Sequence, residues 1–245
     1  MVACETLIFY TQDFRPFCYI ENGEVAGPFR EIIDVVCNEA GFEPEYSLFP
    51  WRRAIRQAKK GYADALFVLG WNKQRTEWLY FSHPVVTTEY GFFFHKNNPF
   101  EYSDVKDLIG MNYTVGVYGP SNTSDKLMNI AAKVPDLKIE LTHDDISGFK
   151  KLSAKRIQSV YSNKDVGFSI IEEHNIKNVR YCKKERNLQY YIGFVKKKNS
   201  KKTVERFNNA YKTLYNQGII QQILDKYNLE IFKLKDSTDL VLQPR

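Results

Sequence analysis

Hydrophobic and polar positions follow two periods in the first third of the chain. Short apolar runs at 7–10, 46–49 and 65–69 are typical of buried strands. Between them, apolar residues recur at every third or fourth position over 29–36 and 51–58, which predicts helices with one buried face. This alternation is typical of parallel β–α–β units, so we expect an α/β protein.

Turn residues delimit these elements. Pro28 fits the first position of a helix, and Gly41 is a natural stop for it. The second helix closes at Gly61, after two lysines whose charge favours a helix C-terminus. Before the first helix, the pair Asn22-Gly23 predicts the tight turn of a small hairpin.

The rest of the chain repeats the alternation and adds two long β runs. We expect strands at 113–117, 137–141 and 157–161, and helices after 123, over 145–154, over 165–174, and from 204 and 219. The β runs at 84–94 and 188–196 are long for single strands, and each contains a glycine. We interpret them as crossings between two lobes: lobe I holds 1–88 and 193–245, and lobe II holds 89–192.

Composition narrows the class of protein. Of the 245 residues, 43% are hydrophobic and 15% aromatic, enough for a packed core. No apolar run reaches the ~20 residues that span a bilayer. The net charge of +6 is modest, and its densest stretch, 196–202, has five lysines but no arginine or aromatic residue. We interpret that stretch as a solvated turn, and we expect no nucleic-acid partner.

Sequence signatures of enzymes and metal sites do not occur. The chain has no Gly-x-Ser-x-Gly elbow, no phosphate loop and no dinucleotide-binding glycine pattern. The histidines, which are His83, His95, His143 and His174, are scattered without metal-ligand spacing. We therefore expect no catalytic residue, no metal and no cofactor.

One polar loop, over 70–84, follows the apolar strand at 65–69 and carries Arg75. Loops at the carboxyl edge of an open α/β sheet are where such sheets bind ligands. A guanidinium in that position is well suited to clamp a carboxylate with two parallel hydrogen bonds. The structural alternative is a surface arginine paired with Glu77 or Asp64.

This arrangement resembles the solute-binding proteins of amino-acid ABC importers, the family 3 type. The resemblance rests on the strand before the Arg75 loop, on Phe81-Ser82-x-Pro84 after it, on the two crossings, and on the pattern from Gly218 to Tyr227. It covers nearly the whole chain. It implies a two-lobed periplasmic-binding-protein-like fold (type II), with two β–α sheets joined by two crossing strands. It also implies a ligand captured between lobes that close about a hinge.

The resemblance also implies which residues bind the ligand. Carried over position by position, they are Phe14, Trp51, Val68, Gly70, Arg75, Ser121, Asn122 and Asn163. In this scheme Phe14 and Trp51 sandwich the ligand, Arg75 holds its carboxylate, and backbone groups of Val68 and Gly70 contact it. For Trp51, core packing is a serious alternative, because it shares a helix face with Ala54 and Ile55.

The lobe II positions depart in part from the family pattern. Ser121 and Asn122 open a helix, where free N–H groups favour an anion, although an ordinary N-cap explains the same residues. Asn163 stands where the family has an aspartate for the ligand's ammonium group. A neutral amide there favours a carboxylate-bearing ligand over a zwitterion, unless Asp165 or Glu89 supplies the missing charge.

Cysteines and the N-terminus bear on the compartment. Only four residues precede Glu5, too few for a signal peptide, so we expect a secreted chain whose leader has been removed. Cys4 and Cys37 are placed by a β–α unit at the same end of the sheet, which predicts a disulfide; lipidation of Cys4 is the competing prediction. We expect a location in the periplasm or on the outer face of the membrane.

The leading hypothesis is a monomeric binding protein for a small carboxylate-bearing solute, such as an amino acid or a related organic acid, that delivers it to ABC importer membrane subunits. One alternative is the ligand-sensing domain of a signalling receptor. Another is a small dehydratase or lyase built on the same fold. The leading hypothesis predicts binding without catalysis.

Overall fold

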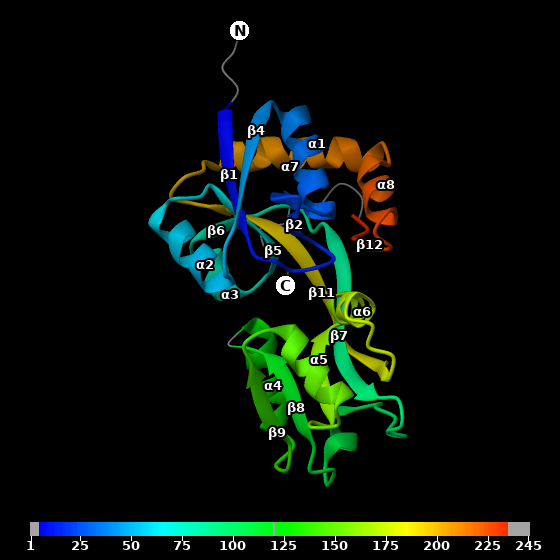
Figure 1. Cartoon of the computed structure of the whole chain (residues 1–245). Coiled ribbons are helices and arrows are strands. Elements are labelled where there is room, and N and C mark those ends of the chain that lie inside the picture. Colours follow the sequence, from blue (N-terminus) through cyan, green and yellow to red (C-terminus); the bar gives the residue numbers. More distant parts are fainter. Residues whose placement is uncertain (1–4, 120, 235–245) are drawn as a thin grey trace. The chain divides into compact units, whose positions relative to one another are not determined.

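The computed structural model describes residues 5–119 and 121–234, which form two compact units (Figure 1). Unit 1 comprises the chain up to Thr87 and from Gln189 onward, and unit 2 is the segment Thr88–Leu188. The chain passes between the units twice, within β7 (Val86–His95) and within β11 (Val179–Val195). The sequence placed these passages at 88/89 and 192/193, in the same two strands.

Unit 1 is built around three parallel strands. Its strands are β1 (Glu5–Thr11), β4 (Phe42–Leu48), β5 (Ala65–Gly70), β6 (Leu79–Phe81) and β12 (Glu230–Ile231). The order is β4-β1-β5, and β11 lies antiparallel to β5. Every residue of β5 is buried, as its unbroken apolar run predicts. The carboxyl ends of the parallel strands therefore share one edge of this sheet.

The helices of unit 1 are α1 (Pro28–Ala40), α2 (Trp51–Lys60), α3 (Lys73–Thr76), α7 (Lys201–Asn216) and α8 (Ile219–Asp225). Two of them, α1 and α2, end at the predicted turn residues, and one, α3, lies where the sequence predicted a loop. Gly41 and Gly61 end α1 and α2 in the left-handed conformation. Asn22 and Gly23, both with positive φ, join β2 (Tyr19–Glu21) to β3 (Glu24–Ala26), which confirms the hairpin.

Unit 2 repeats the β–α scheme. Its parallel strands are β8 (Thr114–Tyr118), β9 (Lys138–Thr142) and β10 (Ser159–Asn163), with β7 antiparallel to β10. Its helices are the 3₁₀ turn η1 (Val105–Leu108), α4 (Asn122–Ala131), α5 (Asp145–Ser153) and α6 (Lys164–Glu173). Each of α4, α5 and α6 begins just after a parallel strand ends, so their N-termini share one edge of unit 2 (Figure 1).

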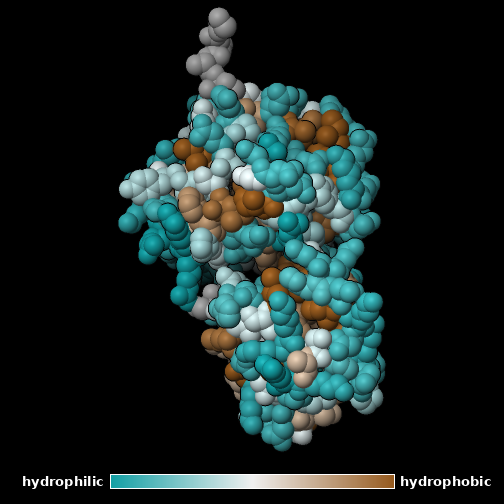
Figure 2. Space-filling view, viewed as in Figure 1, coloured by the Kyte–Doolittle hydropathy of each residue, from teal (hydrophilic) through white to brown (hydrophobic). Residues whose placement is uncertain are grey.

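Aromatic residues fill the interior of unit 2. Phe92, Phe94 and Tyr161 are fully buried in one cluster, together with Leu127 from α4. A side chain at Gly91 would collide with the backbone oxygen of Lys183 and the ring of Tyr181, so β7 and β11 approach there more closely than a Cβ allows. On the face seen in Figure 2, the surface of each unit is mainly hydrophilic, with apolar residues gathered in patches.

Two sequence-based expectations concern segments outside the described residues. Cys4 lies outside them, so its pairing with Cys37, which is buried in α1, stays a prediction. The tail from 235 to 245, which the sequence pattern did not assign to any element, also lies outside them. Among the helices described, none is long and apolar enough to cross a membrane.

Candidate functional site

The Arg75 loop of unit 1 is held by a single helical turn, where the sequence predicted only a loop. Asn72 caps α3, and its side-chain oxygen accepts a hydrogen bond from the backbone N–H of Arg75 at 2.8 Å. Gly70, at the end of β5, accepts a second bond from the Arg75 guanidinium at 2.5 Å. Backbone and side chain of Arg75 are thus both fixed at the carboxyl edge of the sheet.

Arg75 has no carboxylate partner in the part of the chain that the structure describes. Asp64, one of the two alternatives, accepts the N–H of Ile8 and lies 3.7 Å from Lys198 instead. Glu77, the other, is exposed and does not act on the guanidinium. Burial lowers the pKa of Arg75 to about 10, so the side chain stays cationic at neutral pH. A half-buried cation without a counter-ion is typical of a site that receives an anion.

Aromatic rings surround this cation. The Arg75 guanidinium lies 5.7 Å from the ring centre of Trp51, within cation–π range. Trp51 is half-buried and also packs against the apolar cluster under α2, as its core-packing interpretation predicts, while its contact with a ligand stays a prediction. Phe14 is half-buried in the loop after β1, with its ring 5.6 Å from Phe17 and 5.8 Å from Tyr190.

Tyr190 is a site residue that the sequence reasoning missed. It lies opposite Gly70 across the β5–β11 pair, packs edge-on against Phe14, and its phenol raises the pKa of Arg75. The signal in the sequence is its place in the second long β run, which predicts only a crossing strand. Tyr190 therefore joins Phe14 to the Arg75 loop within unit 1.

Val68 adopts a backbone conformation that β-branched residues rarely take. Its φ is 56°, in the left-handed region, although it lies inside β5 and is buried. The register across to β11 shifts at this point: Leu69 faces Tyr191 and Phe67 faces Ile192, which leaves Val68 as the extra residue of a bulge. The backbone groups of Val68 are thereby turned away from the regular ladder.

Ser121 and Asn122 lie at the start of α4 in unit 2. The Ser121 hydroxyl accepts hydrogen bonds from the backbone N–H groups of Thr123 and Ser124. The Ser124 hydroxyl accepts one from the backbone N–H of Ser121, which completes a capping box. The ordinary N-cap interpretation accounts for these bonds. Asn122 is exposed at the first position of the helix.

Asn163 caps α6 and is buried. Its side-chain oxygen accepts the N–H groups of Asp165 and Val166, and its amide donates to the Thr88 hydroxyl at 2.8 Å. Thr88 in turn donates to the Asp165 carboxylate at 2.6 Å. Glu89, the other acid considered as a substitute, is paired with Lys164 at 3.1 Å. Both candidate carboxylates thus already have partners within unit 2.

The structure therefore groups the predicted residues unit by unit. In unit 1, Arg75 contacts both Trp51 and Gly70, Val68 lies two residues before Gly70, and Tyr190 lies between Phe14 and Gly70. In unit 2, Asn163 and the pair Ser121–Asn122 cap helices at one edge of the sheet. Among the described residues, no group of His, Cys, Asp and Glu is arranged to hold a metal ion. The binding role of each position stays a prediction.

Comparisons with known proteins identify the family and the fold of the chain. The sequence profile of the bacterial extracellular solute-binding proteins, family 3, matches residues 7–230. No curated protein sequence matches the chain. Many solved structures share its fold, which confirms the expected two-lobed α/β architecture.

Three of these structures illustrate the range of roles on the fold. A histidine kinase sensor domain similar to periplasmic binding proteins has a TM-score of 0.82 at 19% identity, covering 93% of this chain and 98% of its own. The ancestral amino-acid-binding protein AncCDT-1, a precursor of cyclohexadienyl dehydratase, has a TM-score of 0.76 at 18% identity and covers 91% and 94%. An amino acid ABC transporter substrate-binding protein, AbpA from Streptococcus pneumoniae, was solved with L-arginine; it has a TM-score of 0.75 at 18% identity and covers 91% and 94%.

Proposed function

The chain belongs to the bacterial extracellular solute-binding proteins of family 3, and from this premise we propose that it captures a small carboxylate-bearing solute for import by an ABC transporter. The solute is an amino acid or a related organic acid. It is bound and released unchanged.

The observation that carries this proposal is the guanidinium of Arg75, which has no carboxylate partner among the described residues. Its position is fixed by Gly70 and Asn72, and it stays cationic at neutral pH without a carboxylate partner in the described chain. A carboxylate placed on this fork gains two parallel charge-assisted hydrogen bonds. Trp51 and Phe14 offer flat apolar faces for the body of the solute.

In this proposal the solute contacts both lobes and favours their closed arrangement, which importer subunits then recognise. AbpA, which has the same fold, supports this role, because it is described as an ABC transporter substrate-binding protein and was solved with an amino acid. We propose that the protein works as a monomer in the periplasm or on the outer face of the membrane.

A sensor role is the second candidate. It is favoured by the likeness to a histidine kinase sensor domain, whose TM-score is 0.82. A sensor module would use the same ligand contacts, so binding data do not separate the two roles. Co-purification of the full-length protein with importer subunits supports import, whereas a signalling domain encoded in the same chain supports sensing.

A lyase is the third candidate, favoured by the likeness to the dehydratase precursor AncCDT-1. This candidate predicts turnover. Proton NMR of a bound solute incubated with excess protein separates the roles: an unchanged spectrum over hours supports binding, and new resonances support catalysis.

The central test uses Arg75. A thermal-shift panel of standard amino acids and small organic acids first identifies a solute, and calorimetry then measures its affinity for the Arg75→Ala, Arg75→Lys and Lys73→Ala variants. Loss of a charge-assisted pair costs about 1.5–3 kcal/mol, so Arg75→Ala should bind at least tenfold more weakly. Arg75→Lys should recover only part of this loss, because the fork geometry is gone.

Lys73 is the matched control, since it is an exposed cation on the same helical turn. Its replacement should leave affinity unchanged. Equal affinity of the wild-type and Arg75→Ala proteins for every solute that binds would contradict the proposal.

A further inference from the structure

The solvent face of α2 in unit 1 carries only positive charge. Its five cations are all exposed, and they are Arg52, Arg53, Arg56, Lys59 and Lys60. At about 100° per residue they fall within about a third of the helix circumference. The helix contains no acidic residue, and among the described residues none of the five cations forms an ion pair.

This arrangement does not favour the helix itself. Arg52 and Arg53 lie in the first turn of α2, where the helix dipole favours acidic residues. Arg56 lies four residues from both Arg52 and Lys60, and like charges at that spacing repel each other along the helix surface. Acids placed among these cations would make α2 more stable. The stability of the helix therefore does not explain the charge that it carries.

The lysine-rich turn after β11 adjoins the C-terminal end of α2. The end of β11 pairs with the start of β5, so both segments reach the same edge of the sheet (Figure 1). A Cβ at Gly61, just after α2, would lie 3.9 Å from the side chain of Lys198. Lys197 and Lys198 are exposed in this turn. The arginines that the stretch 196–202 lacks in the sequence are thus supplied by α2.

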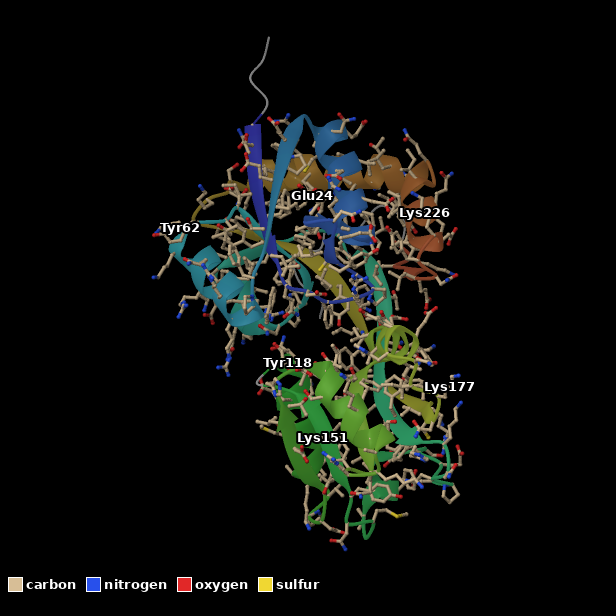
Figure 3. The ribbon with its side chains drawn as sticks, in the orientation of Figure 1. Glu24, Tyr62, Tyr118, Lys151, Lys177 and Lys226 are labelled. Carbon is tan, nitrogen blue, oxygen red and sulfur yellow. The ribbon has the colours of Figure 1, made fainter. Side chains whose placement is uncertain are left out.

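Aromatic side chains lie among these cations. The Lys59 ammonium is 5.0 Å from the ring centre of Trp78, and the Lys196 ammonium is 5.1 Å from that of Tyr80. Tyr62, which follows α2, is 60% exposed, and Figure 3 shows it at the outer margin of unit 1. Tryptophan and tyrosine rings beside lysine and arginine are typical of a surface at the boundary between membrane and water.

Acidic residues of unit 1 gather mainly on the other face of its sheet. Ile8 and Tyr10 pack in the cluster under α2, whereas Phe9 packs toward α1, which carries three acids and one arginine. Near α2, the buried Asp64 lies 3.7 Å from Lys198. The exposed acids there, without an ion pair among the described residues, are Glu43, Glu45 and Glu77. The five cations of α2 with Lys197 and Lys198 outnumber these acids.

We propose that this basic surface, formed by the five cations of α2 with Lys197 and Lys198, docks unit 1 on an anionic phospholipid bilayer. Charge complementarity carries the proposal, because each cation near such a bilayer is attracted without a fixed hydrogen-bond geometry. Long flexible side chains without protein partners suit that diffuse charge. Trp78 and Tyr80 add rings that suit the headgroup region. The inference goes beyond the proposed function and uses none of its ligand contacts.

The test is flotation of the full chain with vesicles at low ionic strength. The wild-type protein should float with vesicles of equal parts phosphatidylglycerol and phosphatidylcholine, should not float with phosphatidylcholine alone, and should be released by high salt. The triple variant Arg52→Gln, Arg56→Gln and Lys60→Gln should bind the anionic vesicles about a hundredfold more weakly, since each basic residue contributes about a fivefold gain.

This variant should keep its fold, because the three side chains lack ion pairs in the described chain and glutamine is a good helix former. Its melting temperature should not fall, and its affinity for the solute should be unchanged. The matched control replaces three exposed lysines of unit 2 in the same protein, Lys126→Gln, Lys133→Gln and Lys177→Gln. It has the same net charge and should still bind the anionic vesicles as the wild-type protein does.

The other outcomes overturn the inference. Failure of the wild-type protein to float, equal flotation with neutral vesicles, or equal loss in the two triple variants would each show that α2 forms no specific membrane surface. Tighter binding to a DNA or RNA oligonucleotide than to anionic vesicles at the same salt would assign the surface to nucleic acid instead. None of these results changes the calorimetry of the Arg75 variants, so the proposed function stands or fails separately.

Discussion

At the scale of single residues, Val68 shows a conflict between side chain and backbone. A left-handed conformation costs an ordinary residue about 1–2 kcal/mol, and more for a β-branched one, yet β5 holds Val68 at φ 56°. Such outliers gather where backbone groups must be turned toward a ligand. Here the bulge lies two residues before Gly70, which holds the Arg75 side chain.

This strain predicts an inverted order of stability between two variants. Val68→Ala and Val68→Gly both remove the buried side chain, but only glycine relaxes at positive φ. We expect the Val68→Gly variant to be more stable than the Val68→Ala variant by about 1 kcal/mol. At an ordinary position inside a strand, glycine is instead less stable than alanine. Urea denaturation of the two variants measures this. A more stable alanine variant would contradict the left-handed backbone.

The pKa of Asp145, raised by its burial, predicts that the stability of the protein depends on pH. Its pKa in the folded chain, about 6, lies above the ordinary value of 3.8, so the folded state favours the protonated form and ionisation destabilises it. Asp145→Asn should therefore raise the free energy of unfolding at pH 7.5 by about 1–3 kcal/mol. The gain should shrink as pH falls through 6 and vanish near pH 4.

The charge on Asp144 has the opposite effect on the free energy of unfolding. Hydrogen bonds from Ser147 help to lower the pKa of Asp144, so its charge stabilises the fold above about pH 4. Asp144→Asn should give no gain at pH 7.5. Denaturation curves of both variants at pH 7.5 and 4.5 make the comparison, and equal behaviour of the two would refute the assignment.

Sequence reasoning found some site residues and missed others for physical reasons. Arg75 was detectable because it follows the buried strand β5 by only a few residues. A residue so close to the end of a strand must lie at the edge of the sheet. Tyr190 was not detectable, because its surroundings come from a distant segment: Phe14 lies 176 positions from Tyr190 in the sequence. Burial of a polar group depends on contacts between distant segments, and the periodicity of one segment does not predict them.

At the scale of elements, periodicity predicted the parallel strands and most helices because each buries one regular face. It missed β6 and β12, which have three and two residues and are too short to show a period. It also started β11 near 188 instead of Val179, because the first half of that strand is half-exposed and rich in charge. The pairing of such strands depends on their partners rather than on their own composition.

Close strand approach predicts contrasting effects at two glycines. An alanine at Gly91 would clash with the backbone of Lys183, which cannot move without breaking β11. We expect Gly91→Ala to cost at least about 3 kcal/mol. At Gly148, inside α5, a Cβ would meet only ordinary contacts at 3.5–3.8 Å, so Gly148→Ala should gain about 0.5–1 kcal/mol. Melting temperatures of both variants test this, and similar values would contradict it.

At the scale of the whole molecule, the two units differ in continuity. Unit 2 is one uninterrupted segment with its own aromatic core, whereas unit 1 needs β11 from the far end of the chain. We expect the fragment 88–188 to fold alone with a cooperative thermal transition, and the fragment 1–87 to remain unfolded. Circular dichroism and proton–nitrogen NMR of both fragments measure this. A folded 1–87 fragment would show that β11 is dispensable for unit 1.

The position of β11 late in the sequence means that β5 is synthesised long before the strand that pairs with it. β5, whose six residues are all buried in the finished protein, leaves the ribosome roughly 120 residues before the strand that covers its open edge. At 5–20 residues per second, that wait is about 6–24 s. During it, an apolar strand with unpaired N–H and C=O groups is exposed to other nascent chains, a known route to aggregation. The topology that divides the protein into two units thus also leaves the N-terminal segment of the nascent chain without its covering strand until β11 has been synthesised.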